Sequence, residues 1–262
     1  MDCLELNTLK QWFDAYVRSF YTEDSNDRRN VALKEEHTHR VCGIMTEISR
    51  SLSFDEGRTA LAEAIALFHD VGRFPQYREY RTFNDRQSTN HAALGAKVLI
   101  ENNVLGNVQR RERDIAIRAV TLHNVFAVPE GLDTDTLLFL RMVRDADKLD
   151  IWRVALENFA LHESERPSAV GLGLPDTPGY SREVLASVLR REMVPMSSLT
   201  TLNDFKLLQL AWIYDLNFDR SLELVGERGY VDKIAAMLPA VDEIRKTIDV
   251  VREYVDGKVK KG

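Results

Sequence analysis

The chain has 262 residues, of which 44% are hydrophobic and 29% are charged, so it is long enough to bury a sizeable core and is not expected to be disordered. Its net charge of -6 argues against a nucleic acid polymer or an anionic membrane as the main partner, because both are bound by broad basic surfaces. With only Cys3 and Cys42, the chain cannot build a disulfide framework or a cysteine-based zinc cluster.

Residues 1–30 lack the basic start, apolar middle and small-residue cleavage site of a signal peptide. No apolar run reaches the ~18 residues that a membrane-spanning helix needs. We therefore expect a soluble, cytoplasmic protein.

Apolar residues recur at helical spacing from the N-terminus onward. Between residues 4 and 20 they predict an amphipathic helix, and the polar stretch at 22–30 is expected to be a linker. The next helix is expected over 31–51, with His37 on its apolar face. His39 is turned about 200° away from His37 and is not a candidate ligand.

The stretch ALFHDVGRF, at 66–74, ends a third helix. That helix leads to His69 and Asp70, and the glycine and proline that follow are expected to stop it. Candidate N-caps precede this helix and two later ones, at Ser53 or Asp55, at Ser88 or Asn90, and at Asp133 or Thr134. Residues 73–90 show no sustained periodicity and are interpreted as a loop over the site.

Two further helices are expected to present a histidine each. The first begins at His91 and carries Gly95 on the same face, where the missing side chain would let a neighbour approach closely. The second runs over roughly 108–123 and ends at its histidine, His123.

A long helix then places Asp147 on an apolar stripe. A carboxylate is costly to bury without a cation or several donors, which indicates that something binds it. Residues 162–180 form the clearest break, and GLGLPDTPG within it is interpreted as a surface loop, because it lacks the Lys-Ser/Thr ending of a phosphate loop. Five helices are expected beyond it, over 181–193, 203–215, 219–226, 230–237 and 241–256. The predicted class is all-α.

One buried histidine is more often a core side chain than a ligand, but four histidines and two aspartates on different helices favour a metal site. The candidate ligands are His37, His69, Asp70, His91, His123 and Asp147. Such ligands suit Fe, Mn, Zn or Co. Six exceed what one open catalytic centre needs, whereas two divalent ions about 3.5 to 4 Å apart, bridged by Asp70 and a hydroxide nucleophile, would use them all.

Five segments, in this order, resemble the six-ligand branch of the HD-domain superfamily of metal-dependent phosphohydrolases. They are HTHRV at 37–41, HDVGRF at 69–74, HAALG at 91–95, LHN at 122–124 and DADKLD at 145–150. By this resemblance His37, His69, Asp70 and Asp147 are the core ligands, while His91 and His123 hold a second metal. Asp145 is expected to be either solvated or hydrogen-bonded to a ligand. The cyclic-dinucleotide-cleaving HD-GYP group has a lysine where this chain has Arg73, so its specific activity is not implied.

Three regions and a class of substrate are expected. The N-terminal helix (1–25) would pack on an HD domain (26–165), and a C-terminal helical extension (166–262) would pack on the core as one globular unit. The substrate would be a small phosphorylated molecule such as a nucleotide, cleaved at a phosphate ester or phosphoanhydride. Asp70 and Arg73 are the candidate catalytic residues. Candidate phosphate-binding residues are Arg73, Arg78, Arg81, Arg86 and Lys148.

Two alternative functions stay open. Some oxygen-using enzymes on the HD fold have the same order of ligands, so a di-iron oxygenase is the first alternative. The second is a regulatory module that senses a nucleotide without catalysis. The C-terminal region is expected to be a helical cap on the core or, alternatively, the surface of a homo-oligomer.

Overall fold

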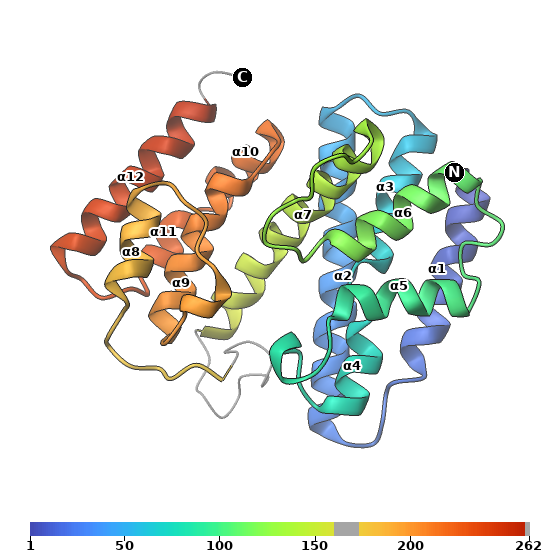
Figure 1. Ribbon diagram of the computed structural model, residues 1–262, viewed down its shortest axis with the longest axis horizontal. Coiled ribbons are helices and arrows are strands. Elements are labelled where there is room, and N and C mark those ends of the chain that lie inside the picture. Colours follow the sequence, from blue (N-terminus) through green and yellow to red (C-terminus); the bar gives the residue numbers. More distant parts are fainter. Residues whose placement is uncertain (160–172, 260–262) are drawn as a thin grey trace. The chain divides into compact units, whose positions relative to one another are not determined.

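The computed structural model describes residues 1–159 and 173–259, and this part of the chain is all-α, as predicted (Figure 1). The described chain divides into two compact units, the first comprising residues 1–150 and the second residues 151–159 and 173–259. The predicted domain boundary at 165/166 and most of the break at 162–180 lie outside the described residues.

The first unit is built around one buried helix. Its elements are α1 (Cys3–Arg18), α2 (Ser25–Ser51), α3 (Glu56–Phe68), α4 (Arg73–Tyr80), the short 3-10 helix η1 (Asp85–Gln87), α5 (His91–Glu101), α6 (Arg110–Leu122) and the first part of α7 (Thr134–Phe159). From Ala60 to Phe68 every residue of α3 except Glu63 is buried, and α1, α2 and α6 pack against it. A helix that is apolar on nearly all sides is stable only when it is surrounded in this way.

Three helices begin at residues whose side chains cap the first turn. Asp55 accepts a hydrogen bond from the amide of Arg58 and begins α3, while Asn90 accepts one from Ala93 and begins α5. Of the candidate N-caps, Asp55 and not Ser53 therefore begins α3, and Asn90 and not Ser88 begins α5. At α7 the carboxylate of Asp133 accepts from the amide of Thr136.

The predicted linker at 22–30 is partly wrong, because α2 already begins at Ser25. Asp24 caps this helix by accepting from the amides of Asn26 and Asp27. Asn30 is fully buried and donates to the hydroxyl of Tyr77. The polar residues of this stretch are therefore held by polar partners, which apolar periodicity does not detect.

The predicted loop at 73–90 is also wrong, since it contains α4 and η1. Phe74 and Tyr77 of α4 are buried. The ring of Phe74 packs against Phe13 of α1 and against Phe20, which follows α1. Arg81 ends the helix in the left-handed conformation. The helix is only two turns long, so its buried residues are too few to show a period.

Gly95 allows the close approach that its position predicts. A Cβ at Gly95 would lie 3.3 Å from the amide nitrogen of Gly72, which is the N-cap of α4. The end of α3 and the beginning of α5, which carry candidate ligands, are thus in backbone contact.

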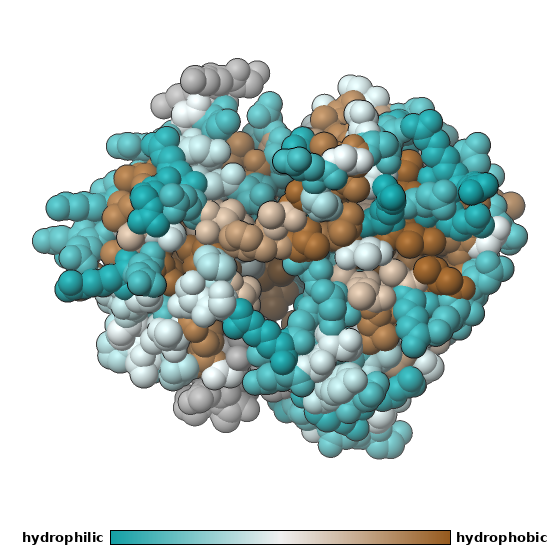
Figure 2. Space-filling model, viewed as in Figure 1, coloured by the Kyte–Doolittle hydropathy of each residue, from teal (hydrophilic) through white to brown (hydrophobic). Residues whose placement is uncertain are grey.

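The second unit holds the remaining helices. They are α8 (Arg182–Leu189), η3 (Met196–Ser198), α9 (Leu202–Ala211), η4 (Trp212–Asp215), α10 (Asp219–Glu227), α11 (Tyr230–Ala235) and α12 (Asp242–Val259), close to the predicted ranges. Trp152 is fully buried and donates to the carbonyl of Gln209, and the carboxylate of Asp204 accepts from the amides of Ser181 and Thr200. Hydrophilic residues cover the outer margins of each unit (Figure 2). Among the described residues, every helix is too short or too polar to cross a membrane.

Candidate metal centre

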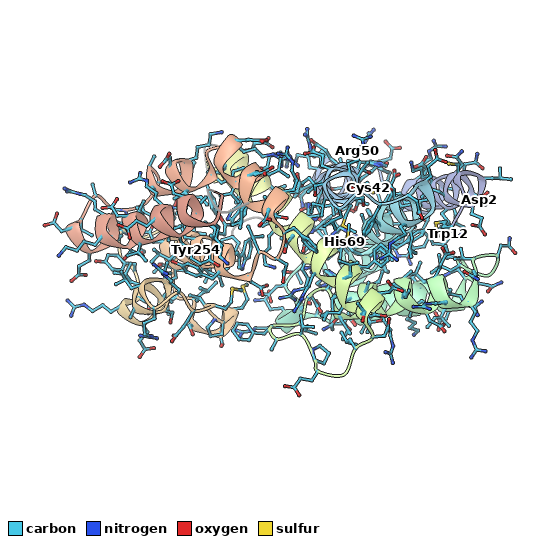
Figure 3. The ribbon with its side chains drawn as sticks, turned by 90° about the horizontal axis from the view of Figure 1, so that it is seen from above. Asp2, Trp12, Cys42, Arg50, His69 and Tyr254 are labelled. Atoms are coloured by element: carbon cyan, nitrogen blue, oxygen red, sulfur yellow. The ribbon has the colours of Figure 1, made fainter. Side chains whose placement is uncertain are left out.

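Four histidines from four helical segments meet inside the first unit. His37 lies in the middle of α2 and His91 is the first residue of α5, whereas His69 and His123 stand one residue beyond the ends of α3 and α6. None of the four is more than 4% exposed. Figure 3 shows His69 within the helices of this unit. Four imidazoles buried together require polar partners or a cation.

The two carboxylate oxygens of Asp70 face different pairs of histidines. Oδ2 lies 3.6 Å from Nε2 of His37 and 3.8 Å from Nε2 of His69. Oδ1 lies 3.3 Å from Nε2 of His91 and 3.7 Å from Nε2 of His123. Each pair of histidines, with Asp70, forms a group whose ligand atoms could hold one metal ion. We call them the first half-site (His37, His69 and Asp70) and the second half-site (His91, His123 and Asp70).

Asp147 adds to the first half-site. Its Oδ1 lies 3.1 Å from Nε2 of His37 and 3.7 Å from Nε2 of His69. Its side chain is 19% exposed, unlike the buried histidines, so the first half-site opens towards solvent at this carboxylate. Asp145, two residues earlier, is fully buried, which excludes the expectation that it is solvated.

The other ring nitrogen of each histidine is held by an oxygen. Nδ1 of His69 donates to the carbonyl of Ala66, and Nδ1 of His123 donates to the carbonyl of Val120, in each case three residues earlier. Nδ1 of His37 lies 2.7 Å from Oδ2 of Asp150. A carbonyl can only accept, so the first two contacts fix the proton on Nδ1 and leave Nε2 as an electron-pair donor.

His91 repeats this arrangement with a carboxylate. Its Nδ1 lies 2.7 Å from Oδ2 of Asp85, in η1. All four histidines therefore turn Nε2 inward and bind an oxygen through Nδ1, which is how imidazole ligands are oriented in metal sites. The donor set of nitrogen and carboxylate oxygen fits divalent transition metals.

The electrostatics of the two half-sites differ. Burial and Lys34 act to lower the pKa of His37, but its hydrogen bonds to Asp147 and Asp150 outweigh them and raise that pKa to about 9. Burial and the charge of Arg73 lower the pKa of His91 to about 3. Neutral imidazole is thus strongly favoured at His91, whereas a cation, either a proton or a metal, is favoured at His37.

The two aspartates are held as carboxylates. Burial alone would raise the pKa of Asp70, but neighbouring charges, chiefly that of Lys34, hold it well below its usual range. Burial also acts to raise the pKa of Asp147, but the neighbouring imidazoles, chiefly the hydrogen-bonded His37, keep that pKa well below its ordinary value. Both side chains are therefore available as anionic ligands.

Two cations lie beside Asp70. Nζ of Lys34, one turn before His37 on α2, is 2.7 Å from Oδ2, and Nε of Arg73 is 3.4 Å from Oδ1. The ring of Phe83 lies beneath both, at 5.5 Å from Lys34 Nζ and 6.0 Å from the guanidinium carbon of Arg73. Each side chain is 16% exposed, so both reach the boundary between the site and solvent.

The other predicted phosphate-binding residues differ from Arg73 in their surroundings. Arg78 is exposed and stacks on Phe20 at 4.6 Å, and Arg81 pairs with Asp27. Arg86 is exposed, and Lys148 is buried with its ammonium group donating to the Arg144 carbonyl. Of the predicted arginines, Arg73 is the one that the structure places against a candidate ligand, Asp70, among the described residues.

Three residues that sequence reasoning missed belong to this site: Lys34, Asp85 and Asp150. Lys34 had a detectable signal, because a residue three before His37 lies on the same face of a helix. Asp150 had a weaker one, three residues after Asp147 on α7. Asp85 had no such signal, since its segment lacks periodicity and some of its partners, such as Asn124, are distant in the sequence.

Comparisons with known proteins agree with this geometry. The family model described as HD domain matches residues 35–152, a stretch that contains all six candidate ligands. Searches of curated proteins and of solved structures found no significant match.

Proposed function

We propose that the chain is a metal-dependent phosphohydrolase, since the HD domain family model matches its residues 35–152. Its substrate would be a nucleotide or another small phosphorylated metabolite, cleaved at a phosphate ester or phosphoanhydride. The observation that carries the proposal is the placement of Asp70, whose two oxygens face two separate pairs of imidazole nitrogens. A carboxylate so placed suits two ions that share one ligand.

The six ligands divide between two ions. His37, His69 and Asp147 would hold the first ion, His91 and His123 the second, and Asp70 would bridge them. Divalent Fe, Mn, Zn or Co bound there would lower the pKa of a water, so that hydroxide is available near neutral pH. The Nδ1 contacts to Asp150, Asp85 and two backbone carbonyls keep the rings in the orientation that binding requires.

Lys34 and Arg73 support a phosphorylated substrate. Both cations stand beside the bridging carboxylate, at the edge of the site that solvent reaches. A phosphoryl group at this edge would gain charge-assisted hydrogen bonds from them, and these strengthen as negative charge develops on its oxygens. Lys34 was not predicted from the sequence, and Arg73 was.

A substrate screen coupled to metal analysis tests this function. The full chain, stripped with chelator and reloaded with Mn, Fe, Co or Zn, is assayed against nucleotides and generic phosphate esters for released phosphate, with and without oxygen. We expect metal-dependent release of phosphate that does not need oxygen. Turnover that consumes oxygen would favour the di-iron oxygenase instead. Nucleotide binding without turnover would favour the sensing module.

A further inference from the structure

In each half-site an aspartate contacts Nδ1 of one histidine, but the two aspartates differ in their burial. In the first, His37 is bound by Asp150 of α7, whose side chain is 1% exposed. In the second, His91 is bound by Asp85 of η1, whose side chain is 29% exposed. The support of the second half-site therefore comes from a partly exposed residue of a short segment, and not from a buried residue of a long helix.

The carboxylate of Asp85 accepts hydrogen bonds from several side chains besides His91. Its Oδ1 accepts from Nη1 of Arg73 and from Nε2 of Gln76, each at 2.9 Å. Its Oδ2 accepts from Nδ2 of Asn124 at 3.2 Å, and Asn124 directly follows the ligand His123. One carboxylate thus connects α4, α5 and the end of α6 around the second half-site.

The carboxylate of Asp85 faces one cation and two hydrogen-bond donors. Its Oδ1 forms an ion pair with Nη1 of Arg73, and Nδ1 of His91 and Nε2 of Gln76 lie within hydrogen-bond distance of the carboxylate. An anionic acceptor at Nδ1 raises the basicity of the opposite nitrogen and fixes the plane of the ring. Nε2 of His91 is thereby held 3.3 Å from Oδ1 of Asp70 and 3.0 Å from Nε2 of His123.

We infer that Asp85 is a positioning residue for the second metal ion, and that it does not support the first. Through His91 it sets the affinity of the second half-site, and Asp150 does the same for the first half-site through His37. This inference rests on the two-ion site of the proposed function. It adds that the two ions are supported separately, so that the second can be lost while the first stays bound.

Gln76 provides a control for the segment itself. Its Nε2 donates to Asp85, to the hydroxyl of Ser88 and to the carbonyl of Thr89, so Gln76 holds the segment around η1. Among the described residues its hydrogen bonds are to residues other than histidine. If Asp85 acted only by holding this segment in place, removing the Gln76 side chain would have the same effect as removing the Asp85 carboxylate.

Metal binding to variants of the full chain tests the inference without any substrate. Chelator-competed Co²⁺ or Zn²⁺ titrations are made on the wild type, Asp85→Ala, Asp85→Glu, Asp150→Ala and Gln76→Ala, with circular dichroism to confirm the fold. For Asp85→Ala we expect one affinity to fall by about 10- to 100-fold, the other to stay within about threefold, and Asp85→Glu to recover part of the loss. If Asp85→Ala does not fold, Asp85→Asn replaces it with the same expectation in direction.

Double variants identify the ion that is lost. Asp85→Ala should add no further loss to His91→Ala, but combined with His37→Ala it should remove both ions. The inference is overturned if Asp85→Ala keeps both affinities, if both fall equally, if Gln76→Ala has the same effect, or if the wild type binds one ion only. A wild type that binds two ions, responds to Asp85→Ala as expected and hydrolyses no phosphate compound would refute the proposed function and leave this inference standing.

Discussion

Gly72 and Gly95 meet backbone to backbone, so that a Cβ on Gly72 would lie 2.5 Å from the amide nitrogen of Gly95 and would also overlap the carbonyl oxygen of His91. This contact joins the chain just after His69 and Asp70 to the first turn of α5. We predict that Gly72→Ala forces these segments apart and lowers the free energy of unfolding by about 1–3 kcal/mol, as overpacking does. Urea unfolding measures the change.

Gly43 is the matched control for this substitution. It lies within α2, where a Cβ would meet nothing within 4 Å. Gly43→Ala should leave stability unchanged or raise it by about 0.5–1 kcal/mol, because alanine favours a helix. Equal effects of the two substitutions would show that the Gly72 contact does not constrain the site.

Lys34 should act on the substrate and not on the metal. Its ammonium group lies 2.7 Å from Oδ2 of Asp70 and is partly exposed. We predict that Lys34→Gln lowers kcat/KM for a phosphorylated substrate by roughly a hundredfold, while Lys34→Arg retains part of the activity. Phosphate release is measured beside metal content. Loss of metal from Lys34→Gln would mean that Lys34 mainly holds the carboxylate of Asp70.

Arg73 and Arg86 differ sharply in their surroundings, although both were predicted to bind phosphate. Arg73 contacts Asp70 and Asp85, whereas Arg86 is exposed. Arg73→Ala should raise KM or lower kcat with the metal still bound, and Arg86→Ala should change neither. Steady-state kinetics on both variants decide this, and an equal loss in the two would contradict the assignment.

His37 and His91 should give the chelator-treated protein opposite pH dependences of stability. The pKa of His37 is raised to about 9, so its contribution is fully present below the unfolded value of 6.5 and is lost as pH rises through 9. The pKa of His91 is lowered to about 3, so its contribution is present above 6.5 and is lost as pH falls towards 3. For each histidine the free energy of unfolding can change by up to about 1.4 kcal/mol per pH unit.

Substitutions separate the two contributions. Urea unfolding across pH should show that His91→Gln flattens the acid side of the stability curve and that His37→Gln flattens the alkaline side. Unchanged slopes in either variant would contradict the ionisation that we assign to that histidine.

The sequence predicted those parts of the site that follow from local periodicity. His37 and His91 lie on helical faces, and a helix end placed His69 and Asp70 together; each is buried as expected. The close approach at Gly95 was also predictable, because a glycine inside a helix usually marks a near neighbour.

The remaining features depend on contacts between residues that are distant in sequence. Asp85 reaches Asn124, 39 residues later, and Arg81 reaches Asp27, 54 residues earlier. Arg78 stacks on Phe20. No local pattern indicates which arginine of a basic segment finds such a partner. All four arginines were therefore predicted to bind phosphate, although Arg73 alone was also predicted to be catalytic.

The number of divalent ions bound per chain by the wild type and by Asp70→Ala tests the central claim most directly. Asp55→Ala is the control, because it removes the N-cap of α3 and leaves the ligands unchanged. Elemental analysis should find about two ions in the wild type and in the control, and fewer than one in Asp70→Ala, because both half-sites lose their shared carboxylate. Two ions retained in Asp70→Ala, or the loss of only one, would contradict the bridging role of Asp70.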